Sequence, residues 1–441
     1  MDSRPPICRI GAGAGFAGDR IEPAVALAAS GEVDAVALEC LAERTLLPAL
    51  KARAADPAQG YDPRLRRRLK PLLPVARANR CAIVSNLGQA NPRAAGRAIA
   101  TLAAELGLKG LRIAAVHGDD VMGLREHIAW DQPLQGSLVG AHAYLGARPL
   151  AAALAEGAEV VVTGRVADSA LFAAPALLRL DEGEAALAGA IAVGHLLECS
   201  GQLSGGNYAP VGGAMLSAEA YANLGFPLAE VYADGSAEIR LLAGAPGLLN
   251  PETCTLQLFY EVHDPARYAT PDCVLDFSGV RFEPTGPQRV RMSGARSLGP
   301  PPTLKVAGFI ERPGWIADCE IGFAGSGALE RARRSAETLR LRLHDWADDD
   351  IAVDVVGVDS ILRAGSAPSR AAPAECRVHV SARCPDLEAA QIVEDEIYAM
   401  TLSGPAGGCS VRSERRSRIE VVDGYIPAHR IEVGIEWSEA P

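Results

Sequence analysis

Residues 7–20 read ICRIGAGAGFAGDR, and this stretch sets the fold of the N-terminal part of the chain. An apolar, strand-like run leads into a glycine-rich loop, and Pro23 then marks the first turn of an apolar helix. Gly13, Gly15 and Gly18 form a literal G-x-G-x-x-G, the pattern that joins a strand to a helix in dinucleotide-binding folds. The stretch therefore predicts the first strand–loop–helix unit of a parallel sheet.

Four further apolar runs of strand length follow, with amphipathic helical stretches between them. They are residues 33–38, 81–85, 111–116 and 159–163. Proline stands where the helices begin and glycine where they end. Uniformly apolar strands that alternate with helices are typical of a parallel sheet covered on both faces. We therefore expect a Rossmann-like α/β domain over residues 1–225.

The pattern changes after this domain. Alternating polar and apolar runs predict antiparallel strands; they are residues 236–242, 254–264 and 303–311. Two predicted helices, within residues 327–346 and 385–400, are flanked by such strands, as in split βαβ elements. Residues 284–303, rich in glycine and proline, are interpreted as a long connection. We expect an α+β domain with antiparallel strands over residues 226–441.

Polar side chains gather directly after the predicted strands of the first domain. The carboxyl ends of parallel strands share one edge of the sheet, and ligands bind in the crevice there. The sequence therefore predicts a ligand site at this edge. The predicted catalytic residues are Glu39, Glu43, His117, Arg165 and Asp168.

The glycine-rich loop has more than one interpretation. Glu39 lies 21 residues after Gly18 at a strand end, where a dinucleotide fold places its ribose-binding acid. However, Pro23 delays the helix beyond the glycines, so a pyrophosphate would not meet free N–H groups at its start. A backbone nest for an anion or carboxylate and a simple tight turn are the alternatives. The predicted substrate-binding residues are Gly13, Gly15, Phe16, Gly18, Asp19 and Arg20, with Asn86 and Asn207.

The charged residues of this edge also have competing roles. Glu39 and Glu43 are the predicted general acid/base groups, because desolvation at a strand end raises a carboxyl pKa; ion pairing is the alternative. Arg165 is expected to bind a ligand carboxylate or one of these glutamates. Asp168 precedes an apolar helix and is either its N-cap or a functional group. His117 is the predicted proton carrier.

Composition excludes several classes of function. The net charge of −11 argues against non-specific nucleic-acid binding. No apolar run is long enough to span a membrane and no signal peptide is recognisable, so we expect a cytoplasmic protein. The ten cysteines form no C-x-x-C pair and are interpreted as small buried apolar residues. His195, Glu198 and Cys199 share a helical face, but without a second cluster no metal is predicted.

Seven segments together resemble the acyclic terpene utilisation protein AtuA family. They are GAGAGFAGDR (11–20), LECLAERT (38–45), SNLGQANP (85–92), VVTGRVADSAL (161–171), GHLLECSGQLSGGNY (194–208), DPARYATPD (264–272) and TLSGPAGG (401–408). The resemblance implies a place in the catabolism of branched isoprenoid acids through CoA thioesters. Longer members carry a C-terminal ferredoxin-like domain with an R-S-G-D-K-G-D signature, which is not found here. The resemblance thus implies a separate small ferredoxin-like partner polypeptide, beside an expected homo-oligomer.

The leading hypothesis is an enzyme of lyase or hydratase type acting on an acyl-CoA thioester or branched carboxylate. No cofactor is expected; the CoA thioester would be the substrate. Backbone N–H groups of the glycine-rich loop would stabilise a developing enolate. The alternatives are an NAD(P)-dependent oxidoreductase and a non-catalytic subunit of a hetero-oligomeric complex.

Overall fold

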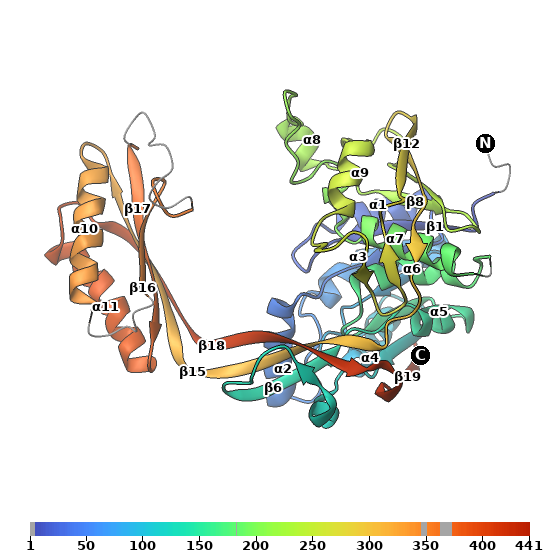
Figure 1. Cartoon of the computed structure of the whole chain (residues 1–441), viewed down its shortest axis with the longest axis horizontal. Helices are drawn as coiled ribbons and strands as arrows, with labels where there is room; N and C mark the ends of the chain where they lie inside the picture. The colour runs from blue at the N-terminus through green and yellow to red at the C-terminus, as the bar shows by residue number, and fades with distance from the viewer. Residues whose placement is uncertain (1–4, 182, 345–350, 362–372) are drawn as a thin grey trace. The chain divides into compact units, whose positions relative to one another are not determined.

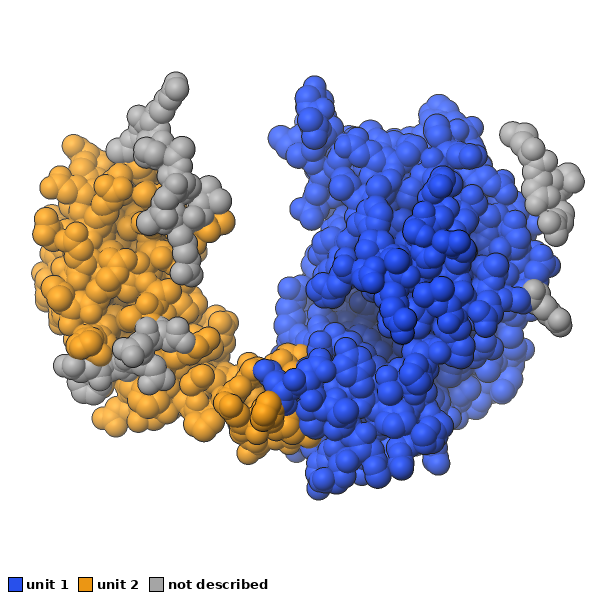
Figure 2. Space-filling view, viewed as in Figure 1, with its two compact units in different colours: residues 1–132, 140–308, 423–441 blue, residues 133–139, 309–422 orange. Residues whose placement is uncertain are grey.

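A computed structural model describes residues 5–181, 183–344, 351–361 and 373–441. The chain forms two compact units, coloured separately in Figure 2. Unit 1 comprises residues 1–132, 140–308 and 423–441, and unit 2 comprises residues 133–139 and 309–422. Within the described residues, no helix is long and apolar enough to cross a membrane.

Unit 1 is built around a mixed sheet whose centre is parallel. The parallel strands lie in the order β1 (Cys8–Ala14), β2 (Ala35–Leu38), β3 (Ala82–Ser85), β7 (Val160–Thr163) and β4 (Arg112–His117). All five coincide with the strands that the sequence predicts. The prediction of an α/β unit with a parallel sheet is confirmed at this level.

Antiparallel strands extend the sheet on both sides. β8 (Leu228–Val231), β9 (Ala237–Arg240), β13 (Arg289–Ser293) and β12 (Arg281–Gly286) follow beyond β1, and β19 (Gly434–Glu439) pairs with β4. Cys8 lies opposite Val231, so the chain after residue 225 returns to the first strand. The expected domain boundary at 225/226 therefore lies inside unit 1.

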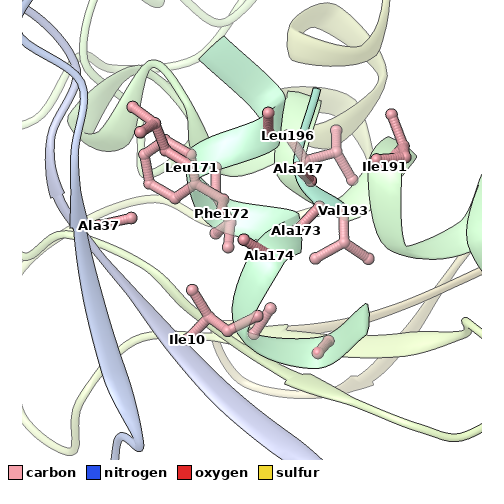
Figure 3. Close-up of a cluster of buried hydrophobic side chains, with 14 of the residues drawn as sticks. Ile10, Ala37, Ala147, Leu171, Phe172, Ala173, Ala174, Ile191, Val193 and Leu196 are labelled. Atoms are coloured by element: carbon pink, nitrogen blue, oxygen red, sulfur yellow. The ribbon is translucent and has the colours of Figure 1, made fainter. Parts of the chain in front are cut away.

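Helices cover both faces of the parallel strands (Figure 1). α1 (Glu22–Ser30), α3 (Leu65–Ala78) and α4 (Pro92–Glu105) contribute to one apolar cluster, and α5 (Arg148–Ala155), α6 (Asp168–Leu177) and α7 (Glu184–Leu197) contribute to the other. Successive strand residues alternate between the clusters: Val36 and Leu38 belong to the first, Ala37 to the second. Figure 3 shows Ile10, Ala37, Phe172 and Ile191 in the second cluster.

The strands β3 and β7 are neighbours in the sheet, but the chain leaves them toward opposite edges of the sheet. After β3 it continues into α4 on one face, whereas after β7 it continues into α6 on the other face. Because the loops after these adjacent strands diverge to opposite faces, a crevice is expected between them. The Gly88 N–H donates to the Thr163 carbonyl at 3.0 Å and joins the two loops at this point.

Unit 2 contains an antiparallel sheet with two helices on one face. The elements follow as β15 (Thr303–Ala324), α10 (Ala328–Arg342), β16 (Ile351–Val356), β17 (Glu375–Cys384), α11 (Leu387–Ser403) and β18 (Cys409–Pro427). The strands lie in the order β16-β17-β15-β18. This is the β-α-β-β-α-β arrangement of a split βαβ unit. β15 and β18 begin or end in unit 1.

Two local predictions are wrong. Residues 254–264 do not form a strand, because Asn250 caps the helix α9 (Pro251–Leu258): its side chain accepts the Thr253 N–H at 3.0 Å. Residues 284–303 are not a long connection but include β13, β14 (Arg296–Ser297) and the end of β12. The remaining α-helices and strands are α2 (Glu43–Ala55), β5 (Ala129–Trp130), β6 (Ser137–Ala143), α8 (Ala218–Ala222), β10 (Tyr268–Ala269) and β11 (Val274–Asp276).

Candidate active site

Arg165, in the loop after β7, is a fully buried cation at the carboxyl edge of the sheet. Its side chain is 2% exposed. Nη1 donates to the Leu41 carbonyl at 2.7 Å, and Nε and Nη2 donate to the Val166 carbonyl at 3.0 and 2.8 Å. Nη2 also donates to Asp168. The guanidinium carbon lies 4.5 Å from the centre of the Tyr144 ring. Most donors of Arg165 are therefore satisfied by the protein itself.

Asp168 is the accessible partner of this cation. It is the first residue of α6, but the N-cap is Ala167 and no side-chain cap is formed. The capping interpretation of Asp168 is therefore wrong, because its carboxylate pairs with Arg165 instead. The side chain is 38% exposed. Burial raises the pKa of Asp168 to about 7 against the opposing charge of Arg165, and the carboxylates of Glu198, Glu43 and Glu261 add to the rise.

Glu39, directly after β2, is a second carboxyl group beside Arg165. It is 6% exposed, and Oε1 accepts the Leu41 N–H at 2.7 Å and the Asn86 side-chain amide at 3.0 Å. Asn86 in turn accepts the Cys40 N–H at 2.6 Å. Burial, assisted by Asp168, holds the pKa of Glu39 well above its ordinary value, although Arg165 opposes this. Burial therefore favours the protonated form of Glu39.

Glu43, the first residue of α2, behaves in the opposite way. Tyr144 donates its hydroxyl proton to Glu43 Oε1. Burial raises the pKa of Glu43, but the hydrogen bond from Tyr144 and the charges of Arg165 and Lys305 outweigh it, so that the pKa is lowered. Glu43 is therefore a carboxylate at neutral pH, held by the hydrogen bond from Tyr144.

The structure adds Tyr144 and Lys305 to this site, both absent from the sequence-based set. The Lys305 ammonium lies 5.5 Å from the Tyr144 ring centre and 3.0 Å from Asp423. No motif in the sequence marked either residue, because they come from segments 161 residues apart that follow no predicted parallel strand. We define the Arg165 cluster as Glu39, Glu43, Asn86, Tyr144, Arg165 and Asp168.

The glycine-rich loop is closed on itself. β1 extends to Ala14, so Gly13 lies within the strand, and α1 begins only at Glu22. The Asp19 carboxylate accepts the N–H groups of Gly15 and Arg20, each at 2.8 Å. These two donors are therefore engaged internally, which weakens the nest and dinucleotide interpretations and favours the tight turn. Gly15 is required sterically: a Cβ there would lie 2.6 Å from the carbonyl carbon of Cys199.

Three other predicted substrate-binding residues, Phe16, Gly18 and Asn207, are not members of the Arg165 cluster. Phe16 is exposed, and Gly18 packs against its ring. The exposed Asn207 makes a long contact of 3.4 Å from its amide to Gln202. The structure therefore does not join these predicted substrate-binding residues to Arg165 by a hydrogen bond among the described residues.

His117 faces a different neighbourhood from Arg165. Its Nε2 lies 3.1 Å from an Arg93 nitrogen, and His117 pairs with Gly434 of β19. Burial and the charge of Arg93 lower the pKa of His117. It shares the sheet edge with the Arg165 cluster, but no contact links it to Asp168 in the described part of the chain.

His195 is a buried, ion-paired residue. Nδ1 lies 2.8 Å from the Glu198 carboxylate, Nε2 lies 3.1 Å from the Leu258 carbonyl oxygen, and the ring stacks on Phe277. Burial opposes protonation, but Glu198 and the Leu258 carbonyl outweigh it and raise the pKa of His195. His195 and Glu198 thus form a structural ion pair at the end of α7, and the charge of Glu198 acts on Asp168.

Comparison with known proteins identifies one family. A model of the acyclic terpene utilisation family protein AtuA matches residues 8–437, nearly the whole chain. No curated protein and no solved structure gives a significant match.

Proposed function

The chain belongs to the acyclic terpene utilisation family AtuA, and on this premise we propose that the Arg165 cluster is an acid/base active site. Family membership implies a role in acyclic terpene utilisation. The proposed substrate is an acyl-CoA thioester or branched carboxylic acid, and the proposed reaction is of lyase or hydratase type. The parallel strands, whose carboxyl edge carries the Arg165 cluster, support a Rossmann-like placement of the site.

The observation that carries this proposal is the contrast between Asp168, a partly exposed carboxyl group with a raised pKa, and Arg165, a fully buried cation. A carboxyl group with a pKa of about 7 is poised for proton transfer near neutral pH, and its 38% exposure lets a substrate reach it. Arg165 is inaccessible, and its bonds to Leu41, Val166 and Asp168 use most of its donors. We therefore assign proton transfer to Asp168 and the orientation of Asp168 to Arg165, rather than substrate binding.

Glu39 of the cluster and the neighbouring Lys305 take supporting roles in this proposal. Glu39 is buried beside Asp168, and its raised pKa favours the protonated form, which would limit the negative charge next to Asp168. Lys305 is the accessible cation beside Tyr144 and would bind an anionic group of the substrate. The Gly15 N–H is occupied by Asp19, so Lys305 replaces the glycine loop as the candidate stabiliser of an enolate.

The proposed reaction is tested with 3-methyl-branched 2-enoyl-CoA thioesters, their 3-hydroxy counterparts and the free acids in deuterated water. Mass spectrometry follows incorporation of deuterium at the carbon next to the carbonyl, and absorbance follows the enoyl thioester. We expect Asp168→Asn to lower the rate by about 10²- to 10⁴-fold. The control is Glu105→Gln, which removes an exposed carboxylate paired with Arg66 and should leave the rate unchanged.

The outcomes separate the roles of the three carboxyl groups. Retention of the full rate by Asp168→Asn, with loss in Glu39→Gln or Glu43→Gln, would move proton transfer to that glutamate. Full rates in all three variants would remove the cluster from catalysis. An absence of exchange with every thioester, with and without a small ferredoxin-like partner, would favour a non-catalytic subunit.

The nicotinamide-dependent alternative rests on the G-x-G-x-x-G pattern and Glu39. Two features do not favour it. In the loop, the Asp19 carboxylate already accepts the N–H groups of Gly15 and Arg20. Outside the loop, the Glu39 carboxyl group already accepts hydrogen bonds from the Leu41 N–H and the Asn86 amide. Titration with NADH and NADPH, followed by ligand fluorescence, tests it directly. Binding below the millimolar range would reinstate this alternative.

A further inference from the structure

A second buried pair of titratable groups lies directly behind the loop that carries Arg165. His142, in β6, is 1% exposed, and its Nδ1 lies 2.8 Å from Oδ2 of Asp119, which follows β4 and is also buried. The same Oδ2 accepts the backbone N–H of Arg165 at 2.8 Å. One carboxylate oxygen therefore links the imidazole to the main chain of the residue that holds Asp168.

The fit between this pair and the loop is tight. A methyl group on Gly164 would overlap the Asp119 carboxylate, so only glycine is accommodated there. Asp119 also accepts the Ala143 N–H through its carbonyl at 2.7 Å, and the Leu145 N–H donates to the Arg165 carbonyl at 3.3 Å. The end of β6 and the loop after β7 are thus held together on both sides of Arg165.

The two ring nitrogens of His142 differ in their hydrogen bonds. Nδ1 faces Asp119, whereas Nε2 is buried and has no hydrogen-bond partner among the residues that the structure describes. A buried polar atom without a partner costs free energy relative to an apolar side chain of the same shape. The favourable contribution of a histidine at this position therefore lies in the donor that Nδ1 presents to Asp119.

We propose that His142 is a positioning residue for Asp168, acting through Asp119 and the backbone of Arg165. The donor at Nδ1 holds the Asp119 carboxylate in place, and this carboxylate fixes the Arg165 main chain. The Arg165 guanidinium is thereby held in place to donate its hydrogen bond to Asp168. The inference rests on the proposed function only for the statement that Asp168 transfers the proton.

Loss of the Nδ1 donor has a predictable electrostatic consequence. A displaced Arg165 would stabilise the Asp168 carboxylate less, so the pKa of Asp168 would rise further. Other groups also act on Asp168, and three of them, Glu39, Glu43 and Tyr144, are coupled to Arg165 as well. Those whose charges couple to Asp168 are Glu39, Glu43, Glu198, Glu261, Tyr144, Cys199 and Tyr268.

The test compares three substitutions of His142 that keep different atoms. His142→Asn keeps a donor at the place of Nδ1 and removes the unpartnered nitrogen; His142→Gln keeps a polar group at the place of Nε2; His142→Leu keeps neither. Carboxyl ¹³C NMR titration of the whole chain measures the pKa of Asp168, whose resonance is identified by its absence in Asp168→Asn. Turnover and its pH profile are measured where the substrate panel gives activity.

We expect His142→Asn to match the wild type in the pKa of Asp168. His142→Leu and His142→Gln should shift that pKa upward and lower kcat about 10- to 100-fold with little change in KM. Gly164→Ala, which displaces the Asp119 carboxylate without touching His142, should shift the pKa in the same direction. It keeps the test decisive if His142→Leu does not fold.

Two results would overturn the inference. An unchanged Asp168 pKa in folded His142→Leu and Gly164→Ala would show that the pair is structural only. Inactivity of His142→Asn with activity in His142→Gln would make Nε2 itself the functional atom. The NMR readout needs no turnover, so failure of the proposed reaction, seen as full activity in Asp168→Asn, is distinguished from failure of this inference.

Discussion

The Arg165 guanidinium donates to the Asp168 carboxylate three residues later in the chain, and only the carboxylate is accessible. The Arg165 side chain is 2% exposed, whereas the Asp168 side chain is 38% exposed. A fully buried cation and a partly buried carboxylate form an asymmetric pair. In the proposed function, Arg165 orients the pair and Asp168 exchanges the proton.

Removal of the buried cation should destabilise the fold strongly. Arg165→Met leaves Asp168 and the carbonyls of Leu41 and Val166 without their donor, so we expect the free energy of unfolding to fall by about 3–5 kcal/mol. Arg66→Met, which breaks an exposed pair with Glu105, is the matched control and should cost less than about 1 kcal/mol. Urea denaturation measures both, and equal losses would contradict the structural role of Arg165.

Glu39 should tolerate replacement by its neutral isostere. Because burial holds the pKa of Glu39 well above its ordinary value, we expect Glu39→Gln to change the free energy of unfolding at pH 7 by less than about 1 kcal/mol. Glu39→Ala leaves the Asn86 amide and the Leu41 N–H without their acceptor and should cost about 1–3 kcal/mol. If Glu39→Gln is as destabilising as Glu39→Ala in thermal and chemical unfolding, Glu39 is ionised in the native state.

Asp272 should make the stability of unit 1 depend on pH. Burial raises its pKa to about 6, against the opposing Ala147 N–H and the charge of Arg148. Because the folded pKa lies above the unfolded one, the stabilisation is complete below about pH 4 and is lost as the pH rises through 6. The loss is on the order of 3 kcal/mol in the wild type and absent in Asp272→Asn. Denaturation curves from pH 4 to 8 that run parallel for the two proteins would refute this.

The glycine-rich loop should respond to steric change rather than to nucleotide. Gly15→Ala places a Cβ 2.6 Å from the carbonyl carbon of Cys199, and we expect a loss of about 1–3 kcal/mol in the free energy of unfolding. Gly123→Ala is the control, since no atom lies within 4 Å of its added Cβ. Equal stability of the two variants would show that the loop has room for a side chain at residue 15.

The sequence predicted the parallel strands because their residues are apolar on both sides. Val36 and Ala37 belong to opposite apolar clusters, and this double burial is visible as an unbroken apolar run. It failed at residues 254–264, where the Asn250 cap and Pro251 outweighed an apparent alternation of polar and apolar residues.

The positions of Glu39, Asn86, Arg165 and Asp168 at one sheet edge followed from the order of strands and helices alone. Such an edge exists wherever parallel strands alternate with crossover helices. The charge states at this edge did not follow from the sequence. A carboxyl pKa depends on burial and on neighbours such as Tyr144 and Glu198, which come from distant segments of the chain. The sequence determined where the carboxyl groups gather, and the tertiary structure decided that Asp168 is the accessible group that titrates near neutral pH.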